Sequence, residues 1–325
     1  MRKLLLLSLL ALGYQSASAE SLLETFGTGA NAFTMEFVTI GNPNNAADTT
    51  GIPNPAGSVA YTYNLGKYEV SREMITKANS AGSLGITMAD MSNRGGNGVN
   101  RPATGISWNE AAIYVNWLNT STGGTAAYKF VGGTFQLWSA GDAGYNSNNL
   151  FRNSNAKFWL PSTDEWYKAA YGSPNGTWYD YPTGSNAQPT NVSGGTDPNT
   201  AVFDQRANNY PYYGPADITN AGGVSAYGTM GQGGNIRDWI ETAVDGINDT
   251  ANEDRYLRGG GWDQLVSLIN TSYNYASPWD ESFSFGFRVV MIPEPSSLSL
   301  LVLGGAVVAL CRRKRALSRL VWEGA

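Results

Sequence analysis

The sequence predicts an α+β domain that is low in regular secondary structure and has long loops. Amphipathic helical patterns are few, strand patterns are short, and a weakly periodic stretch rich in Gly, Asn, Pro and Tyr runs from Gly172 to Gly234. Aromatic residues make up 12% of the 325-residue chain and charged residues only 14%, which is typical of a folded domain rather than a disordered one.

The first 19 residues have the pattern of a secretory signal peptide. A basic start, Met1-Arg2-Lys3, precedes the apolar run Leu4–Leu12, and Ala17-Ser18-Ala19 fits an A-x-A cleavage site. The apolar run is too short to span a bilayer. We therefore expect export, with a mature domain over residues 20–292.

The mature domain is expected to begin with a short N-terminal segment, residues 20–30, and then a strand over 33–40. In "FTMEFVTI", Phe33, Met35 and Phe37 alternate onto one side. A Gly-, Pro- and Asn-rich loop follows, and "YNLGKYEV" predicts a second strand over 63–70. Ser71 is placed to cap a helix that reaches about Ala81.

Two later helices have capping boxes, in which a Ser side chain and a Glu three residues on satisfy each other's backbone donors. The first pairs Ser107 with Glu110, and the second pairs Ser162 with Glu165 and is expected to end at Gly172. The residues predicted to face the core are Trp108, Ala111, Ala112, Val115 and Leu118 in the first helix and Trp166, Ala169 and Ala170 in the second.

Strands return at "RYLRGG" (255–260) and "FSFGFRVVMI" (283–292), which would complete the fold. Arg258 and Arg288 are strand arginines whose planar guanidinium suits a buried bidentate pair with a carboxylate such as Asp238 or Glu241. We see neither an internal repeat nor a second domain.

Composition excludes several kinds of site. The chain has no His, and its one Cys, Cys311, lies beyond the mature domain. This rules out Ser-His-Asp and Cys-His nucleophilic sites, His-containing metal sites and an intramolecular disulfide. Carboxylates, Tyr, Lys, hydroxyls and oxygen-ligated metals remain. Residues 20–292 hold 14 Lys and Arg against 24 Asp and Glu, so nucleic acid and anionic lipid are poor partners.

The C-terminal segment has three parts in a fixed order. Pro293-Glu294-Pro295 precedes an apolar run, Leu298–Cys311, and a basic cluster, 312–315; a ten-residue tail, 316–325, follows. This arrangement resembles the PEP-CTERM sorting signal of Gram-negative bacteria. The resemblance implies recognition by an exosortase, delivery to the cell surface, outer envelope or extracellular matrix, and at least a transient membrane anchor over 293–315. A permanent anchor remains an alternative.

Six segments occur in the order seen in one enzyme family. They are "GKYEVS", "RPATGISWNEAAIYVNWLN", "FWLPSTDEWYKAA", "GGNIRDW", "YLRGGGWD" and "FGFRVV". Together they resemble the formylglycine-generating enzyme (sulfatase-modifying factor) family over nearly the whole mature domain. The resemblance implies a C-type-lectin-like fold and structural calcium.

The family's active enzymes use two cysteines that bind copper and oxidise a sulfatase cysteine to formylglycine. Counting from the R-G-G segment, these positions fall on Gln264 and Ile269. Copper(I) needs a soft ligand, which neither side chain provides. We therefore expect neither copper binding nor formylglycine-generating activity.

With copper not expected, calcium is the remaining cofactor that the resemblance implies. In "GGNIRDW" it implies backbone carbonyls of Gly234 and Ile236 and the carboxylate of Asp238 as ligands, although Gly231 replaces an Asn or Asp of the relatives. The alternative is that Asp238 only hydrogen-bonds loop amides. A second implied site has the candidate ligands Asn208, Asn209 and Asp217.

These observations favour a non-catalytic surface protein that binds a glycan or another surface component. Aromatic rings stack on sugars, so the candidate ligand contacts are Trp178, Tyr179, Tyr181, Trp262 and Gln264. Two alternatives stay open. One is an enzyme with different chemistry that uses a carboxylate pair such as Asp164/Glu165 or Asp238/Glu241. The other is a structural component of an extracellular matrix or biofilm.

Overall fold

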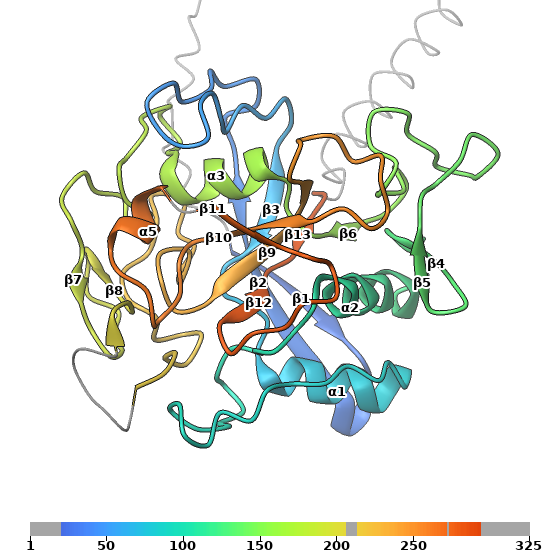
Figure 1. Ribbon diagram of the computed structural model, residues 1–325, viewed down its shortest axis with the longest axis horizontal. Helices are drawn as coiled ribbons and strands as arrows, with labels where there is room; N and C mark the ends of the chain where they lie inside the picture. The colour runs from blue at the N-terminus through green and yellow to red at the C-terminus, as the bar shows by residue number, and fades with distance from the viewer. Residues whose placement is uncertain (1–20, 206–212, 272, 294–325) are drawn as a thin grey trace, which may run out of the picture.

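Two β-sheets form the centre of the domain in the computed structural model, which describes residues 21–205, 213–271 and 273–293 (Figure 1). The five-stranded sheet has the order β1 (Ser21–Phe26), β2 (Phe33–Ile40), β3 (Tyr63–Gly66), β13 (Val290–Met291) and β6 (Phe158–Trp159). The four-stranded sheet has the order β11 (Tyr273–Ala276), β10 (Arg255–Arg258), β9 (Arg237–Ala243) and β12 (Phe285–Phe287).

The described residues also form two small sheets and a few helices. The hairpin joins β4 (Lys129–Val131) to β5 (Thr134–Gln136), and a parallel pair joins β7 (Thr190–Asn191) to β8 (Thr200–Ala201). The helices are η1 (Gly29–Asn31), α1 (Arg72–Gly82), α2 (Trp108–Ser121), α3 (Thr163–Tyr171) and α5 (Ser267–Thr271). Short strands, few helices and long loops confirm the α+β expectation.

The N-terminal part of the mature domain is more regular than expected. The strand predicted over 33–40 is confirmed as β2, with Phe33, Met35 and Phe37 buried. The preceding segment, for which no strand was predicted, forms β1 and pairs antiparallel with β2 from Ser21↔Val38 to Phe26↔Phe33. Phe26 is buried at the end of this pair, whereas most of β1 faces solvent, so its sequence lacks a clear two-residue period.

The second predicted strand is shorter in the structure. β3 ends at Gly66, and the continuation as far as Val70 runs as a loop. The Lys67 N–H donates to the Glu36 carbonyl of β2 at 2.8 Å, and the Val70 N–H donates to the Phe287 carbonyl at 3.0 Å, so this loop passes from its own sheet to the end of β12.

The three longer helices follow the sequence signals. Ser71, Ser107 and Ser162 are the N-caps of α1, α2 and α3, and each side-chain oxygen accepts from the backbone N–H three residues on. Glu110 and Glu165 close their capping boxes as predicted. Satisfying these donors fixes where each helix begins, and α3 ends before Gly172 as expected.

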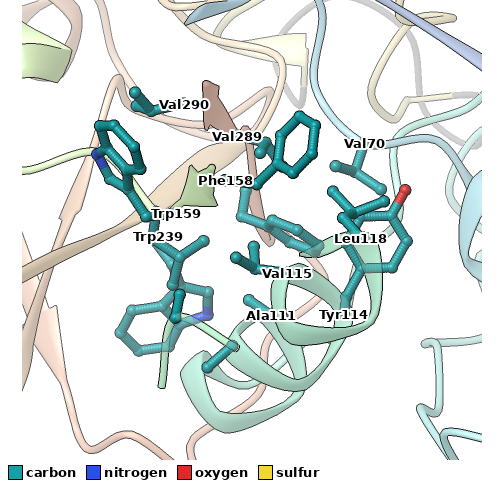
Figure 2. Close-up of a cluster of buried hydrophobic side chains, with 14 of the residues drawn as sticks. Val70, Ala111, Tyr114, Val115, Leu118, Phe158, Trp159, Trp239, Val289 and Val290 are labelled. Carbon is teal, nitrogen blue, oxygen red and sulfur yellow. The ribbon is translucent and has the colours of Figure 1, made fainter. Parts of the chain in front are cut away.

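The apolar face of α2 packs on both large sheets. Figure 2 shows Ala111, Val115 and Leu118 gathered with Phe158 of β6, Trp239 of β9 and the segment after β12. Every residue predicted to face the core from α2 and α3 is buried. Two buried indoles satisfy their N–H groups on backbone carbonyls, since Trp108 donates to Ile240 at 3.0 Å and Trp239 to Ile106 at 2.7 Å.

The final predicted strand, 283–292, is divided between the two sheets. β12 pairs in parallel with β9 in the four-stranded sheet, and β13 pairs with β3 and β6 in the five-stranded sheet. Arg288 lies between the two strands, and its buried guanidinium bonds to the carbonyls of Gly66 and Met230 at 3.2 and 3.1 Å. The arginine therefore ties the crossing point of the sheets to neighbouring loops.

Within the described ranges, no helix has the length and apolar character needed to cross a membrane. The predicted signal peptide, 1–19, and the predicted membrane-associated run, Leu298–Cys311, both lie outside these ranges.

Candidate functional site

The glycine-rich turn after β10 brings the chain close to the core. Gly259 has φ +97°, and a Cβ there would lie 2.7 Å from the Gln232 carbonyl oxygen and 3.1 Å from Cζ2 of Trp166. Only glycine fits both the left-handed backbone and the space. The R-G-G segment is therefore shaped by packing in this chain.

At the two positions that the family resemblance assigns to cysteines, the side chains make contacts that hold the local fold. Gln264 Oε1 accepts from the Gly261 N–H at 3.1 Å, which closes the turn. Ile269, in α5, is fully buried against Ala201 and Phe203, and its carbonyl accepts from the Tyr171 hydroxyl at 2.6 Å. One position is an amide that holds a loop, and the other is part of an apolar cluster.

Arg258 lies behind this turn without the predicted carboxylate pair. Its Nη1 donates to the Ile52 carbonyl at 3.3 Å, and its guanidinium lies 5.8 Å from the centre of the Tyr256 ring. Burial lowers the pKa of Arg258. The expected pairing with Asp238 or Glu241 is wrong for Arg258, because its side chain points toward the loop that contains Ile52.

The turn before β9 leads into a buried ion pair. Asp238 Oδ2 accepts from Arg288 Nε at 2.6 Å and from Trp166 Nε1 at 2.9 Å. Both charged side chains are buried. The predicted pairing of Arg288 with Asp238 is thus confirmed, and the partners of Oδ2 are side chains and not loop amides.

Glu69 is a second buried carboxylate beside this pair. Its Oε2 accepts from Asn235 Nδ2 at 2.7 Å, and a Cβ on Gly231 would lie 3.0 Å from its Oε1. Burial raises the pKa of Glu69 to about 8; Arg288 opposes the shift and Asp238 adds to it. Arg288 is engaged by Asp238, and no described cation forms an ion pair with Glu69, so burial is the largest influence on its pKa.

Two carboxylate oxygens of this polar centre lack hydrogen-bond partners in the part of the chain that the structure describes. Glu69 Oε1 and Asp238 Oδ1 are buried, and neither has a hydrogen-bond partner among the described residues. Carboxylate oxygens are the ligand type that Ca²⁺ prefers, and Gly234 and Ile236 lie on the turn that precedes Asp238. Glu69 was not predicted, because "YEVS" by itself reads as the end of a strand.

The second predicted calcium site is only partly described. Asn208 and Asn209 lie outside the described residues. Asp217 is half-exposed, and its Oδ1 is 3.3 Å from Arg101 Nε. The structure therefore places Asp217 in a surface ion pair.

The predicted ligand-contact aromatics do not form one exposed surface. Trp178 packs on Tyr167, with ring centres 5.6 Å apart, and Tyr181 packs against the cluster that contains Ile269. Tyr179 is half-buried. Trp262 is only 1% exposed, and its ring packs against Tyr213. Its prediction as a ligand contact is therefore wrong, because this ring is part of the hydrophobic core.

A cleft of about 500 Å³ lies next to β6. Figure 1 shows β6 well apart from α5. It is lined by Tyr61, Asn146, Arg152 to Lys157, Trp159, Ile292 and Pro293. Pro293 is the one residue of the predicted sorting signal that the structure describes; Glu294 and Pro295 lie outside the described residues.

A buried charge network forms the back of this cleft. Arg152 Nε is 3.6 Å from Glu241 Oε2, and its Nη1 is 3.8 Å from Glu165 Oε2. Its guanidinium also lies 4.5 Å from the centre of the Trp159 ring. Burial lowers the pKa of Arg152, but Glu241 and Glu165 outweigh it and raise the pKa overall. The cation is thus fixed in its charged form.

Hydrogen bonds hold the two carboxylates in place. Glu165 accepts from the Tyr61 hydroxyl at 2.8 Å and from Trp159 Nε1 at 3.0 Å, besides closing the capping box of α3. Glu241 accepts from the Tyr128 hydroxyl at 2.9 Å. The sequence signal for Glu165 was its capping position; its role in the cleft depends on contacts more than 100 residues away along the chain.

Comparison with known proteins agrees with this architecture. Residues 28–292 match the model of the family described as "Sulfatase-modifying factor enzyme 1-like domain". No curated protein matches the chain. Among solved structures, that of CarF is similar with a TM-score of 0.59 and 17% identity, covering 80% of this chain and 99% of CarF.

Two further structures are similar over most of the domain. Treponema denticola variable protein 1 has a TM-score of 0.55 and 18% identity, covering 84% of this chain and 99% of that one. PvdO from Pseudomonas aeruginosa has a TM-score of 0.51 and 15% identity, covering 83% and 98%. At these identities the likeness concerns the fold alone.

Proposed function

Because this chain belongs to the sulfatase-modifying factor enzyme 1-like domain family, we propose that it is a non-catalytic member that binds a glycan or another component of a cell surface. The observation that carries the proposal is the pair Gln264 and Ile269. A carboxamide and a buried alkyl side chain take the positions where the family's oxidase chemistry needs thiolates, and the chain's single Cys lies outside the domain.

The proposal includes export and surface sorting. Its support is the order of the terminal segments: a signal-peptide pattern at 1–19 and a Pro-Glu-Pro, apolar and basic succession at 293–315. An exosortase-type partner would act at this second segment in the envelope of a Gram-negative bacterium. A C-type-lectin-like architecture, with its loop-borne binding surfaces, is the finer description of the fold that we propose.

Structural calcium is part of the same proposal. Asp238, Glu69 and the carbonyls of Gly234 and Ile236 would hold the ion, and its charge would offset the excess of buried carboxylate. Bound there, calcium would stabilise the turn that precedes β9. No step of a reaction is assigned to it.

The enzyme alternative has less support from the local contacts. Asp238 is engaged by Arg288 and Trp166, Glu241 by Tyr128 and Arg152, and Glu165 by its capping box. Asp164 accepts from the Gly57 N–H at 2.8 Å. These contacts suit carboxylates that hold the fold. A purely structural matrix role remains as the second candidate, favoured if no ligand binds.

Binding of the full-length chain to an array of glycans and isolated surface polysaccharides tests the proposal. We expect selective binding to at least one neutral saccharide class. Uniform absence of binding would contradict it and favour the structural role.

A further inference from the structure

We infer that the cleft beside β6 is the binding site and that its ligand is a neutral saccharide of one or two sugar units. This rests on the proposed binding function and deepens it by naming the site and the chemical class. Neither Gln264 nor Ile269 lines the cleft, so the proposed binding site is separate from the positions that the family resemblance assigns to cysteines.

The size of the cleft sets the size of the ligand. A volume of about 500 Å³ lies within the usual range of roughly 300–1,000 Å³ for small-molecule sites. Such a site accommodates a sugar ring and part of its neighbour, whereas a folded protein partner requires a much larger contact area. A chain end or an exposed branch of a polysaccharide would fit.

The side chains of the cleft match a sugar, which has both apolar and hydroxyl-rich faces. Tyr61 is 40% exposed and Ile292 44% exposed, and with Pro293 they provide an apolar wall. Asn146, Ser154 and Asn155 also line the cleft and provide amide and hydroxyl groups. One exposed ring next to convergent amides is the arrangement that stacks and orients a sugar.

Charge balance argues for a neutral ligand. Arg152 brings one positive charge to the back of the cleft, but Glu165 and Glu241 surround it with two buried carboxylates. Lys157, at the rim, lies 3.3 Å from Glu24. No cation of the cleft is left without an acidic neighbour, so the site does not offer an anionic ligand a net attraction.

The groups that would contact the ligand are held in advance. The Tyr61 ring is fixed through its hydroxyl on Glu165 Oε1 at 2.8 Å. The loop opposite is braced by Asn153, whose Nδ2 donates to the Ala143 carbonyl at 2.8 Å and whose Oδ1 accepts from the Asn155 N–H at 2.9 Å. A rigid site loses little conformational entropy when a ligand binds. This matters for a small polar ligand, because its few contacts offset only a small entropy cost.

The test measures binding of cellobiose, maltose, lactose and N,N′-diacetylchitobiose to the full-length chain by saturation-transfer NMR and calorimetry, with digalacturonic acid as the acidic counterpart. For the neutral sugar that binds best, Tyr61→Ala should weaken binding about fivefold or more, because the stacking face is lost. Asn146→Ala should weaken it about two- to tenfold through a lost hydrogen bond. Tyr61→Phe, which keeps the ring, should stay within about threefold of wild type.

Tyr275→Ala is the matched control, since Tyr275 is 59% exposed on β11 and outside the cleft. Its affinity should equal that of wild type, and circular dichroism should show all variants folded. Neutral-sugar binding that survives both Tyr61→Ala and Asn146→Ala would overturn the assignment of the cleft and leave the proposed binding function standing. Tighter binding of digalacturonic acid would overturn the neutral ligand class. Silence from every saccharide, including the wider array, would overturn both.

Discussion

Arg288 and Asp238 form an ion pair at the crossing of the two sheets, with Arg288 Nε 2.6 Å from Asp238 Oδ2 and both side chains buried. Removing one partner leaves an uncompensated charge in the core. We predict that Asp238→Asn lowers the free energy of unfolding by about 3–5 kcal/mol, measured by urea denaturation.

A surface ion pair supplies the control for this prediction. Lys77 Nζ lies 2.8 Å from Glu73 Oε1 on α1, and both side chains are partly exposed. Glu73→Gln should cost less than about 0.5 kcal/mol, because solvent screens the pair. Equal effects of the two substitutions would refute a special role for the buried pair.

Calcium should stabilise the folded chain, since a cation that binds only the native state raises the melting temperature. We predict a higher Tm in millimolar Ca²⁺ than in EGTA, and loss of that gain in Glu69→Gln, which removes one buried ligand but keeps the ion pair of Arg288. The gain should increase with pH as Glu69 loses its proton.

A cluster of acidic residues at the surface could also bind calcium, so this experiment needs a control variant there. The carboxylates of Asp245, Asp249 and Glu253 have oxygens within 4.8 Å of one another, close enough to share a cation, and they lie outside the sheet crossing. Asp245→Asn should therefore leave the calcium gain intact. Loss of the gain in Asp245→Asn but not in Glu69→Gln would move the calcium site to the surface.

The stability of the chain without calcium should depend on the protonation of Glu69. Burial raises its pKa to about 8 in the folded state, against about 4.3 in an unfolded chain. The folded state thus holds a proton that the unfolded state releases between these values. The stabilisation from Glu69 is complete below about pH 4 and is lost as pH rises through about 8.

Unfolding free energies of wild type and Glu69→Gln, compared in EGTA between about pH 5 and 8, measure this contribution. Wild type should lose stability relative to the variant with rising pH, by at most about 1.4 kcal/mol per pH unit. Parallel pH profiles of the two proteins would show that Glu69 does not titrate in this window.

The glycine turn after β10 should tolerate no side chain. Gly259→Ala places a Cβ against the Gln232 carbonyl and the Trp166 ring, and we predict a loss of about 2 kcal/mol or more in unfolding free energy. Gly246→Ala is matched for backbone strain, with φ +81° but no atom within 4 Å of the new Cβ, and should cost about 1 kcal/mol. Similar losses in both would mean that backbone conformation alone explains the glycine.

Much of the framework could be predicted from local patterns. Ser107 with Glu110 and Ser162 with Glu165 marked two helix starts, because a capping box is defined within four residues. The alternation of Phe33, Met35 and Phe37 marked β2 for the same local reason. By contrast, β1 and the division of the last strand depend on pairing partners, which no local pattern specifies.

The polar sites were harder to predict, because they join residues that are distant in sequence. Asp238 and Arg288 were correctly paired, since the arginine's geometry calls for a carboxylate partner. Glu69 and Arg152 had no such signal: Glu69 meets Asn235 across 166 residues, and Arg152 meets Glu165 and Glu241 only after folding. The burial of Trp262 was not foreseen either, because the sequence does not show whether an aromatic ring is exposed.

The central claim is that this domain keeps the family's shape without its oxidase chemistry. The most direct test incubates the full-length chain with copper, oxygen and a sulfatase-derived peptide that contains the target cysteine, and measures formylglycine by mass spectrometry. We predict no conversion above the copper-only control, because Gln264 and Ile269 provide no thiolate. Formylglycine formed in proportion to the amount of the protein would contradict the account.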